Sequence, residues 1–154
     1  MLATAETLAI MAVRYGGQFA ATPEAVRLGE AIRVKDVTVR FHPAGHVLGS
    51  AQIAMDYAGE RIVVTGDYKR RPDPTCAPFE VVPFDILVTE ATFGLPVFLH
   101  PPTADEVGKL IAAVRAEPER CVLVGAYALG KAQRVIAELR AGGWALPIYI
   151  HGAL

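Results

Sequence analysis

The sequence has 154 residues, of which 53% are hydrophobic and 20% charged, and its 15 Lys and Arg nearly balance its 16 Asp and Glu. This length and apolar content suffice for a folded core and exclude a disordered chain. No apolar run approaches the roughly 18 to 20 residues of a membrane-spanning helix, and no secretory signal opens the chain, so we expect a cytoplasmic protein with no membrane partner. The formal net charge of −1 excludes a global basic field, so nucleic-acid binding would need a local basic patch.

The first half of the chain predicts one helix followed by strands. Apolar residues at helical spacing between Thr4 and Gly16 predict a short amphipathic helix. Alternating apolar and polar residues then predict a half-buried strand that starts at Val37. A second alternating run, 51–57, meets a turn at 58–60 and returns as 61–65, which predicts a hairpin.

The second half predicts an α/β arrangement. Residues 84–89 form another candidate strand, and a proline-rich loop follows it. Thr103 and Glu106 have the spacing of a capping box, which predicts a helix that ends before Pro118. Candidate strands at 121–124 and 147–150 flank a second helical stripe, and together these segments predict a βαβ unit.

Three polar side chains stand at the ends of predicted strands. His46 follows the first long strand in a segment too rich in Gly and Pro for a helix, Asp67 follows the hairpin, and Glu90 follows the strand of 84–89. Imidazole and carboxylate groups are ligands that zinc accepts, so these residues predict one rim with a metal site. The alternatives are a structural or surface role for His46 and a simple Gly66-Asp67 turn.

Four ordered segments resemble motifs of the β-CASP nucleases, a branch of the metallo-β-lactamase fold. They are AGHVLGS with His46, TGDYKR with Asp67, VTEATFG with Glu90, and ALGKAQ with Lys131. The segment TGDYKRRPDPTCAPFE is most similar to bacterial DNA exonucleases associated with an ATP-dependent DNA ligase, a group also labelled mRNA 3′-end processing factors. The resemblance implies an α/β fold, in which a partial αββα metallo-β-lactamase domain (1–95) leads into the βαβ start of a β-CASP domain (96–154).

The resemblance also implies a function and roles for the motif residues. His46 would be a zinc ligand, Asp67 would bridge two zinc ions, and Glu90 would pair with a histidine further along the chain, so that these three are the expected catalytic residues. The implied activity is zinc-dependent hydrolysis of DNA by an exonuclease linked to DNA repair, with an ATP-dependent DNA ligase as a partner. An RNA-processing β-CASP nuclease is the alternative.

Two sets of family motifs are missing from the sequence. The zinc motif His-x-His-x-Asp-His does not occur around any of the four histidines, and the late β-CASP histidines would lie beyond Leu154. The sequence therefore resembles the middle of a nuclease, and we expect this chain alone to retain almost no zinc. A catalytically inactive interaction fragment is a further alternative.

Two basic features are candidates for nucleic-acid binding. Lys69, Arg70 and Arg71 directly follow Asp67, where a phosphate backbone would run, although a solvated basic turn has the same pattern. Lys131 closes a G-x-x-x-x-G-K segment that favours a rival interpretation, a nucleotide-binding P-loop at the start of a helix. Ala132 then replaces the Ser or Thr that would hold Mg²⁺.

Overall fold

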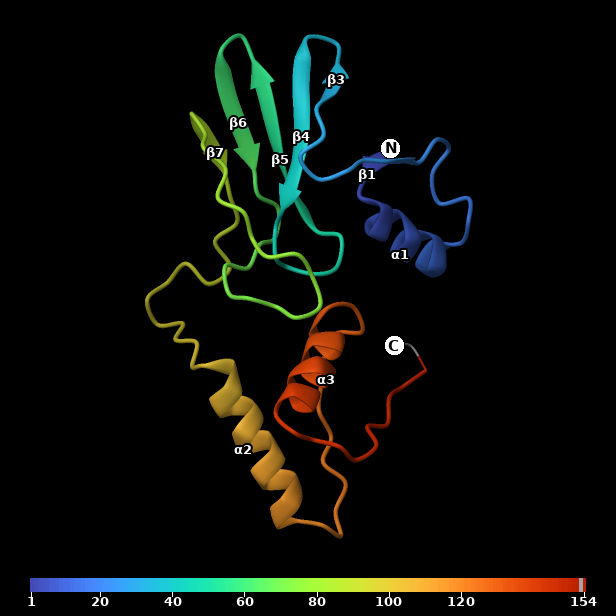
Figure 1. The fold of residues 1–154 in the computed structure, drawn as a ribbon, viewed down its shortest axis with the longest axis vertical. Helices are drawn as coiled ribbons and strands as arrows, with labels where there is room; N and C mark the ends of the chain where they lie inside the picture. The colour runs from blue at the N-terminus through green and yellow to red at the C-terminus, as the bar shows by residue number, and fades with distance from the viewer. Residues whose placement is uncertain (153) are drawn as a thin grey trace. The chain divides into compact units, whose positions relative to one another are not determined.

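The computed structural model describes residues 1–152 and 154 and divides the chain into two units. Unit 1 contains Met1–Ala91 and unit 2 contains Thr92–Leu154. The fold is mixed α/β, with two sheets in unit 1 and helices in both units (Figure 1). The assignment of residues 1–95 and 96–154 to a partial metallo-β-lactamase domain and a β-CASP domain stays a prediction.

Unit 1 is organised around a five-stranded sheet in the order β3-β4-β5-β6-β7. Strands β3 to β6 are antiparallel neighbours, whereas β7 runs parallel to β6. The predicted strand at Val37 and the hairpin are confirmed, and the strand expected at 84–89 is present over three residues. The strands are β3 (Ile32–Val34), β4 (Val37–Pro43), β5 (Ala51–Tyr57), β6 (Glu60–Val64) and β7 (Ile86–Val88).

The most buried face of β5 is the one that carries its polar residue Gln52. Gln52 and Ala54 are each 2% exposed, whereas Ile53 on the opposite face is half-buried. The reason is the segment after β6, which folds back so that Val82 forms a core cluster with Ala54 and Val63. The amide of Gln52 donates to the carbonyl oxygens at 43 and 80 (3.0 and 2.7 Å), which meets its hydrogen-bonding needs inside the fold.

The predicted N-terminal helix is confirmed as α1 (Ala5–Tyr15). Thr4 is its N-cap, and the Thr4 hydroxyl accepts a hydrogen bond from the backbone N–H of Thr7 at 3.3 Å. Two short strands, β1 (Leu2–Ala3) and β2 (Glu24–Ala25), form a separate parallel pair beside α1. Strands of two residues have no periodicity that a sequence could reveal.

Unit 2 contains the two predicted helices, α2 (Thr103–Ala116) and α3 (Lys131–Ala141). Their apolar stripes bury Ile111 of α2 and Leu139 of α3. The predicted capping box is wrong: Pro102 is the N-cap of α2 and makes no side-chain cap bond. The Thr103 hydroxyl lies inside the first turn and instead accepts a hydrogen bond from the Arg134 guanidinium at 3.0 Å.

The predicted βαβ unit is also wrong. Residues 121–124 and 147–150 are not strands, and no strand is present among the described residues of unit 2. A strand needs a neighbour for its backbone hydrogen bonds, and here Leu123 and Tyr149 are almost fully exposed. In the part of the chain that the structure describes, no helix is long and apolar enough to cross a bilayer.

Candidate metal and nucleic-acid site

His46 lies in a tightly folded loop between β4 and β5, which we call the histidine loop (residues 44–50). The Ser50 hydroxyl oxygen accepts hydrogen bonds from the backbone N–H groups of His46 and Val47, both at 3.1 Å. The backbone N–H of Ala44 donates to the Ser50 carbonyl oxygen at 3.2 Å, which closes the loop at its base. The loop therefore holds the His46 backbone in place and leaves its side chain partly exposed.

The N-terminus of α1 holds the histidine loop from one side. The Gly49 carbonyl oxygen accepts hydrogen bonds from the hydroxyl groups of Thr4 (2.7 Å) and Thr7 (3.0 Å). Thr4 is almost completely buried at this contact. The predicted helix therefore also fixes the loop that carries His46, a contact that the sequence did not reveal.

Asp67 reaches the histidine loop from the end of β6. The buried Thr65 anchors this strand end, because its backbone N–H donates to the Val88 carbonyl oxygen of the β7 strand at 3.0 Å. One Asp67 carboxylate oxygen (Oδ2) lies 3.8 Å from Nε2 of His46. The structure therefore brings together the two residues that the sequence proposed as metal ligands, 21 positions apart.

Glu90 lies at the same end of the sheet as Asp67. Strands β6 and β7 are parallel, with Val64 opposite Val88, so the chain leaves both strands at one edge. The hydroxyl groups of Thr65 and Thr89 are 3.3 Å apart and join the two strand ends just before Asp67 and Glu90. The strand ends before Asp67 and Glu90 therefore lie side by side at one edge of the sheet, as predicted. The catalytic role of Glu90 stays a prediction.

The described residues do not by themselves fit a zinc centre. Ligands of a tetrahedral zinc ion lie about 2.0 to 2.2 Å from the metal, so the 3.8 Å between His46 and Asp67 is close to what two such ligands need. A structural zinc site needs four ligands and a catalytic site needs three. No group of three or more His, Cys, Asp and Glu side chains that could hold a metal is present in residues 1–152 and 154.

Within the basic segment that follows Asp67, the Lys69 ammonium forms an ion pair with Asp73, whose side chain is 2% exposed. Burial acts to raise the pKa of Asp73, but hydrogen bonds from Lys69 and Thr75 outweigh it and hold this pKa below its usual range. Arg70 and Arg71 are exposed. The surface charge of the segment therefore belongs mainly to the two arginines.

The loop before α3 does not have the context of a P-loop, because the preceding strand is absent. The backbone N–H of Lys131 donates to the Leu129 carbonyl oxygen (3.1 Å), and that of Ala132 donates to the Tyr127 carbonyl oxygen (3.2 Å). These two backbone N–H groups therefore already have acceptors within the loop, whereas a P-loop would present them to phosphate. The Lys131 ammonium lies 4.9 Å from the centre of the Tyr127 ring, a cation–π arrangement, and its contact with nucleic acid stays a prediction.

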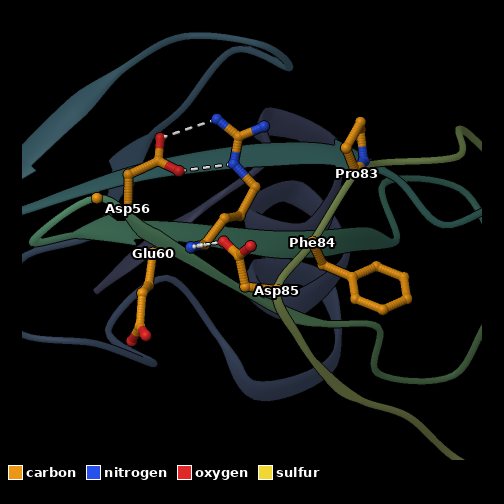
Figure 2. A pocket seen from close by; sticks show the side chains of 7 residues that line it. Asp56, Glu60, Pro83, Phe84 and Asp85 are labelled. Carbon is orange, nitrogen blue, oxygen red and sulfur yellow. Dashed lines mark hydrogen bonds and ion pairs between the residues drawn. The ribbon is translucent and has the colours of Figure 1, made fainter.

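A second concentration of charge, which the sequence analysis missed, lies at the hairpin end of β5 and β6 (Figure 2). Asp56 accepts hydrogen bonds from Arg61 (2.6 and 3.2 Å) and from Arg40 (2.6 Å), and Asp85 accepts one from the Arg61 backbone N–H. The hydrogen bond from Arg61 is the main cause that lowers the pKa of Asp56, and burial opposes it. Asp56 and Arg61 are paired across the hairpin, and this register could have predicted the contact.

Comparison with known proteins finds relatives that are named as ribonucleases and one that is named as a DNA ligase. It is 36% identical over 111 residues to the endoribonuclease ysh1 of Aspergillus fumigatus, a match that covers 69% of this chain and 12% of the relative. It is 34% identical over 121 residues to a probable DNA ligase of Opitutus terrae (75% and 12%). It is 30% identical over 129 residues to an RNase J-like protein of Methanocaldococcus jannaschii (78% and 31%). No protein-family profile matches the chain.

These relatives confirm the resemblance that the sequence motifs indicated. The chain is a homologue of the β-CASP nucleases of the metallo-β-lactamase family. It spans only about an eighth of the length of the first relatives and about a third of the RNase J-like protein.

Proposed function

We propose that the protein is a metal-dependent nuclease that hydrolyses phosphodiester bonds, and that His46 and Asp67 are two of its metal ligands. The observation that carries this proposal is the approach of these two side chains to 3.8 Å. It occurs in a homologue of nucleases, on two loops joined by the backbone hydrogen bond from Lys69 to Ala44. Metal ions in such enzymes supply Lewis acidity and neutralise phosphate charge.

Each motif residue has a defined part in this proposal. His46 presents a ring nitrogen and Asp67 a carboxylate, and both are accessible from solvent, with the Asp67 side chain 73% exposed. Glu90 stands at the neighbouring strand end, where we propose that it pairs with a histidine of the complete site. The ligands that complete the metal site would come from residues other than those near His46 and Asp67 in this structure.

We propose DNA as the substrate and exonucleolytic digestion as the activity, in a repair process that involves an ATP-dependent DNA ligase. The similarity to a protein named probable DNA ligase supports this choice. RNA is the second candidate, because other relatives are named endoribonucleases or RNase J-like. Exposed Arg70 and Arg71 would attract the phosphate backbone of either nucleic acid.

Cleavage assays on the complete gene product that contains these residues test the proposal. Asp67→Asn retains the shape but removes the ligand charge, so cleavage of labelled DNA should fall by about 100-fold or more. Glu60→Gln is the matched control, because Glu60 is an exposed carboxylate at the hairpin end of the same sheet. Normal cleavage by the Asp67→Asn protein would refute the assignment, and cleavage of RNA but not DNA would favour the second candidate.

The metal content of the 154-residue chain provides a separate test. Two ligand groups are too few for tight zinc binding, so we expect less than about 0.2 zinc ions per chain after dialysis. Elemental analysis measures this directly. Two zinc ions retained per chain would show that the described residues form a site that the structure does not display.

A further inference from the structure

A hydrogen bond joins the backbones that carry the two candidate ligands. The Lys69 backbone N–H donates to the Ala44 carbonyl oxygen at 3.0 Å. Lys69 lies two positions after Asp67, and Ala44 lies two positions before His46. This hydrogen bond therefore joins the two backbones close to both candidate ligands.

The two backbones also approach each other closely at Gly45, the residue that follows Ala44. A Cβ atom on Gly45 would overlap the Lys69 carbonyl oxygen and would lie 2.9 Å from the Phe79 backbone nitrogen. The rings of Tyr68 and Phe79 also contact each other, with their centres 5.2 Å apart. Lys69 and Phe79 thus both lie in close contact with the backbone of the histidine loop at Gly45.

Asp73 is the buried carboxylate of the segment that follows Asp67, and both of its oxygens are used. Its Oδ1 accepts hydrogen bonds from the backbone N–H (2.9 Å) and hydroxyl group (2.6 Å) of Thr75, and its Oδ2 pairs with the Lys69 ammonium. An unpaired charge at this depth would be very unfavourable, so Asp73 draws the Lys69 side chain inward, where it is only 22% exposed.

We propose that Asp73 is a positioning residue of the candidate site: through Lys69 it fixes the backbone hydrogen bond to Ala44 that keeps Asp67 beside His46. This role of Asp73 in the active site rests on the proposed nuclease function, but its geometry is testable without any activity. In this arrangement Lys69 serves the local structure, and Arg70 and Arg71 are the exposed basic residues of the segment.

Amide hydrogen exchange of the 154-residue chain, followed by NMR, tests the proposal. The probe is the Lys69 amide, and the internal reference is the Thr65 amide, which donates to Val88 just before Asp67 in the same unit. In Asp73→Asn, and in Lys69→Met, the protection of the Lys69 amide should fall by about tenfold or more, while that of Thr65 changes by less than about twofold. The His46 backbone resonance should shift in the same variants.

Two further variants separate positioning from general stability. Lys69→Arg retains a cation for Asp73 and should preserve protection at position 69. Lys109→Met removes the exposed Lys109–Glu106 pair of unit 2 and should change neither amide.

The proposal is overturned if protection at position 69 survives the loss of Asp73 and of the Lys69 ammonium. It is also overturned if the Lys69 and Thr65 amides lose protection equally, because Asp73 would then only stabilise the fold. A selective loss at position 69, in a protein whose Asp67→Asn variant still cuts nucleic acid, would support the positioning geometry and refute the assignment of Asp67 as a metal ligand.

Discussion

Gly45→Ala should destabilise unit 1 and separate the two candidate ligands. Gly45 has a φ of 68°, in the left-handed region that costs a residue with a Cβ roughly 1 to 2 kcal/mol. The new Cβ would also overlap backbone atoms of Lys69 and Phe79, which cannot rotate away as a flexible side chain would. Overpacking of this kind costs typically 1 to 3 kcal/mol, so the expected loss is about 2 to 5 kcal/mol.

Gly59→Ala is the matched control, because it measures the free-energy cost of a positive φ alone. Gly59 has a φ of 88° in the β5–β6 turn, and a Cβ there would have no atom within 4 Å. It should therefore lose only about 1 to 2 kcal/mol. The difference between the two variants isolates the close approach of the histidine loop to the segment that follows Asp67.

Urea denaturation followed by circular dichroism measures both losses. Trp144, the single tryptophan, belongs to unit 2, so its fluorescence reports on that unit separately. NMR should also show a larger shift of the His46 resonances in Gly45→Ala than in Gly59→Ala. Equal losses in the two variants, or unchanged His46 resonances in Gly45→Ala, would refute the reasoning.

Three other predictions concern the core, the hairpin and the loop before α3. Gln52→Leu removes the two hydrogen bonds that this buried amide donates to the carbonyl oxygens at 43 and 80 and should cost about 1 to 3 kcal/mol in urea denaturation; a loss below about 0.5 kcal/mol would contradict this. Because Arg61 lowers the pKa of Asp56, ionised Asp56 stabilises the fold above about pH 4, and this contribution disappears as the pH falls through the lower folded-state pKa. The stability difference between the wild type and Asp56→Asn should thus shrink from pH 6 to pH 2, and a constant difference would count against the ion pair. Titration calorimetry with Mg-ATP should show no saturable binding, because Ala132 has no hydroxyl group for Mg²⁺, whereas micromolar binding would restore the P-loop interpretation.

Local patterns in the sequence determined the main helices and the antiparallel strands. Capping at Thr4, alternation from Val37, the two-residue turn at 58–59 and the apolar stripes of α2 and α3 all act over a few neighbouring residues. Interactions of this range are encoded where they occur, so a single sequence is enough to read them. The order of the motifs also identified the family, which the relatives confirm.

Failures of prediction occurred where a segment depends on a distant partner. Residues 121–124 have the composition of a strand, but a strand forms only when another segment supplies hydrogen bonds, and none does so among the described residues of unit 2. Thr103 has the spacing of a capping residue, yet its hydroxyl bonds Arg134 from the next helix. In both cases the local sequence pattern is present, but contacts with other segments of the fold decide which structure forms.

The sequence by itself determined which residue types stand at the strand ends, namely His46, Asp67 and Glu90. Only the tertiary structure decided that the first two lie 3.8 Å apart, and that buried Asp73 forms an ion pair with the Lys69 ammonium. The physical reason is that closeness between loops 20 or more residues apart comes from burial, backbone contact and the pairing of buried charges. These are properties of the folded chain as a whole, and no short segment of the sequence carries them.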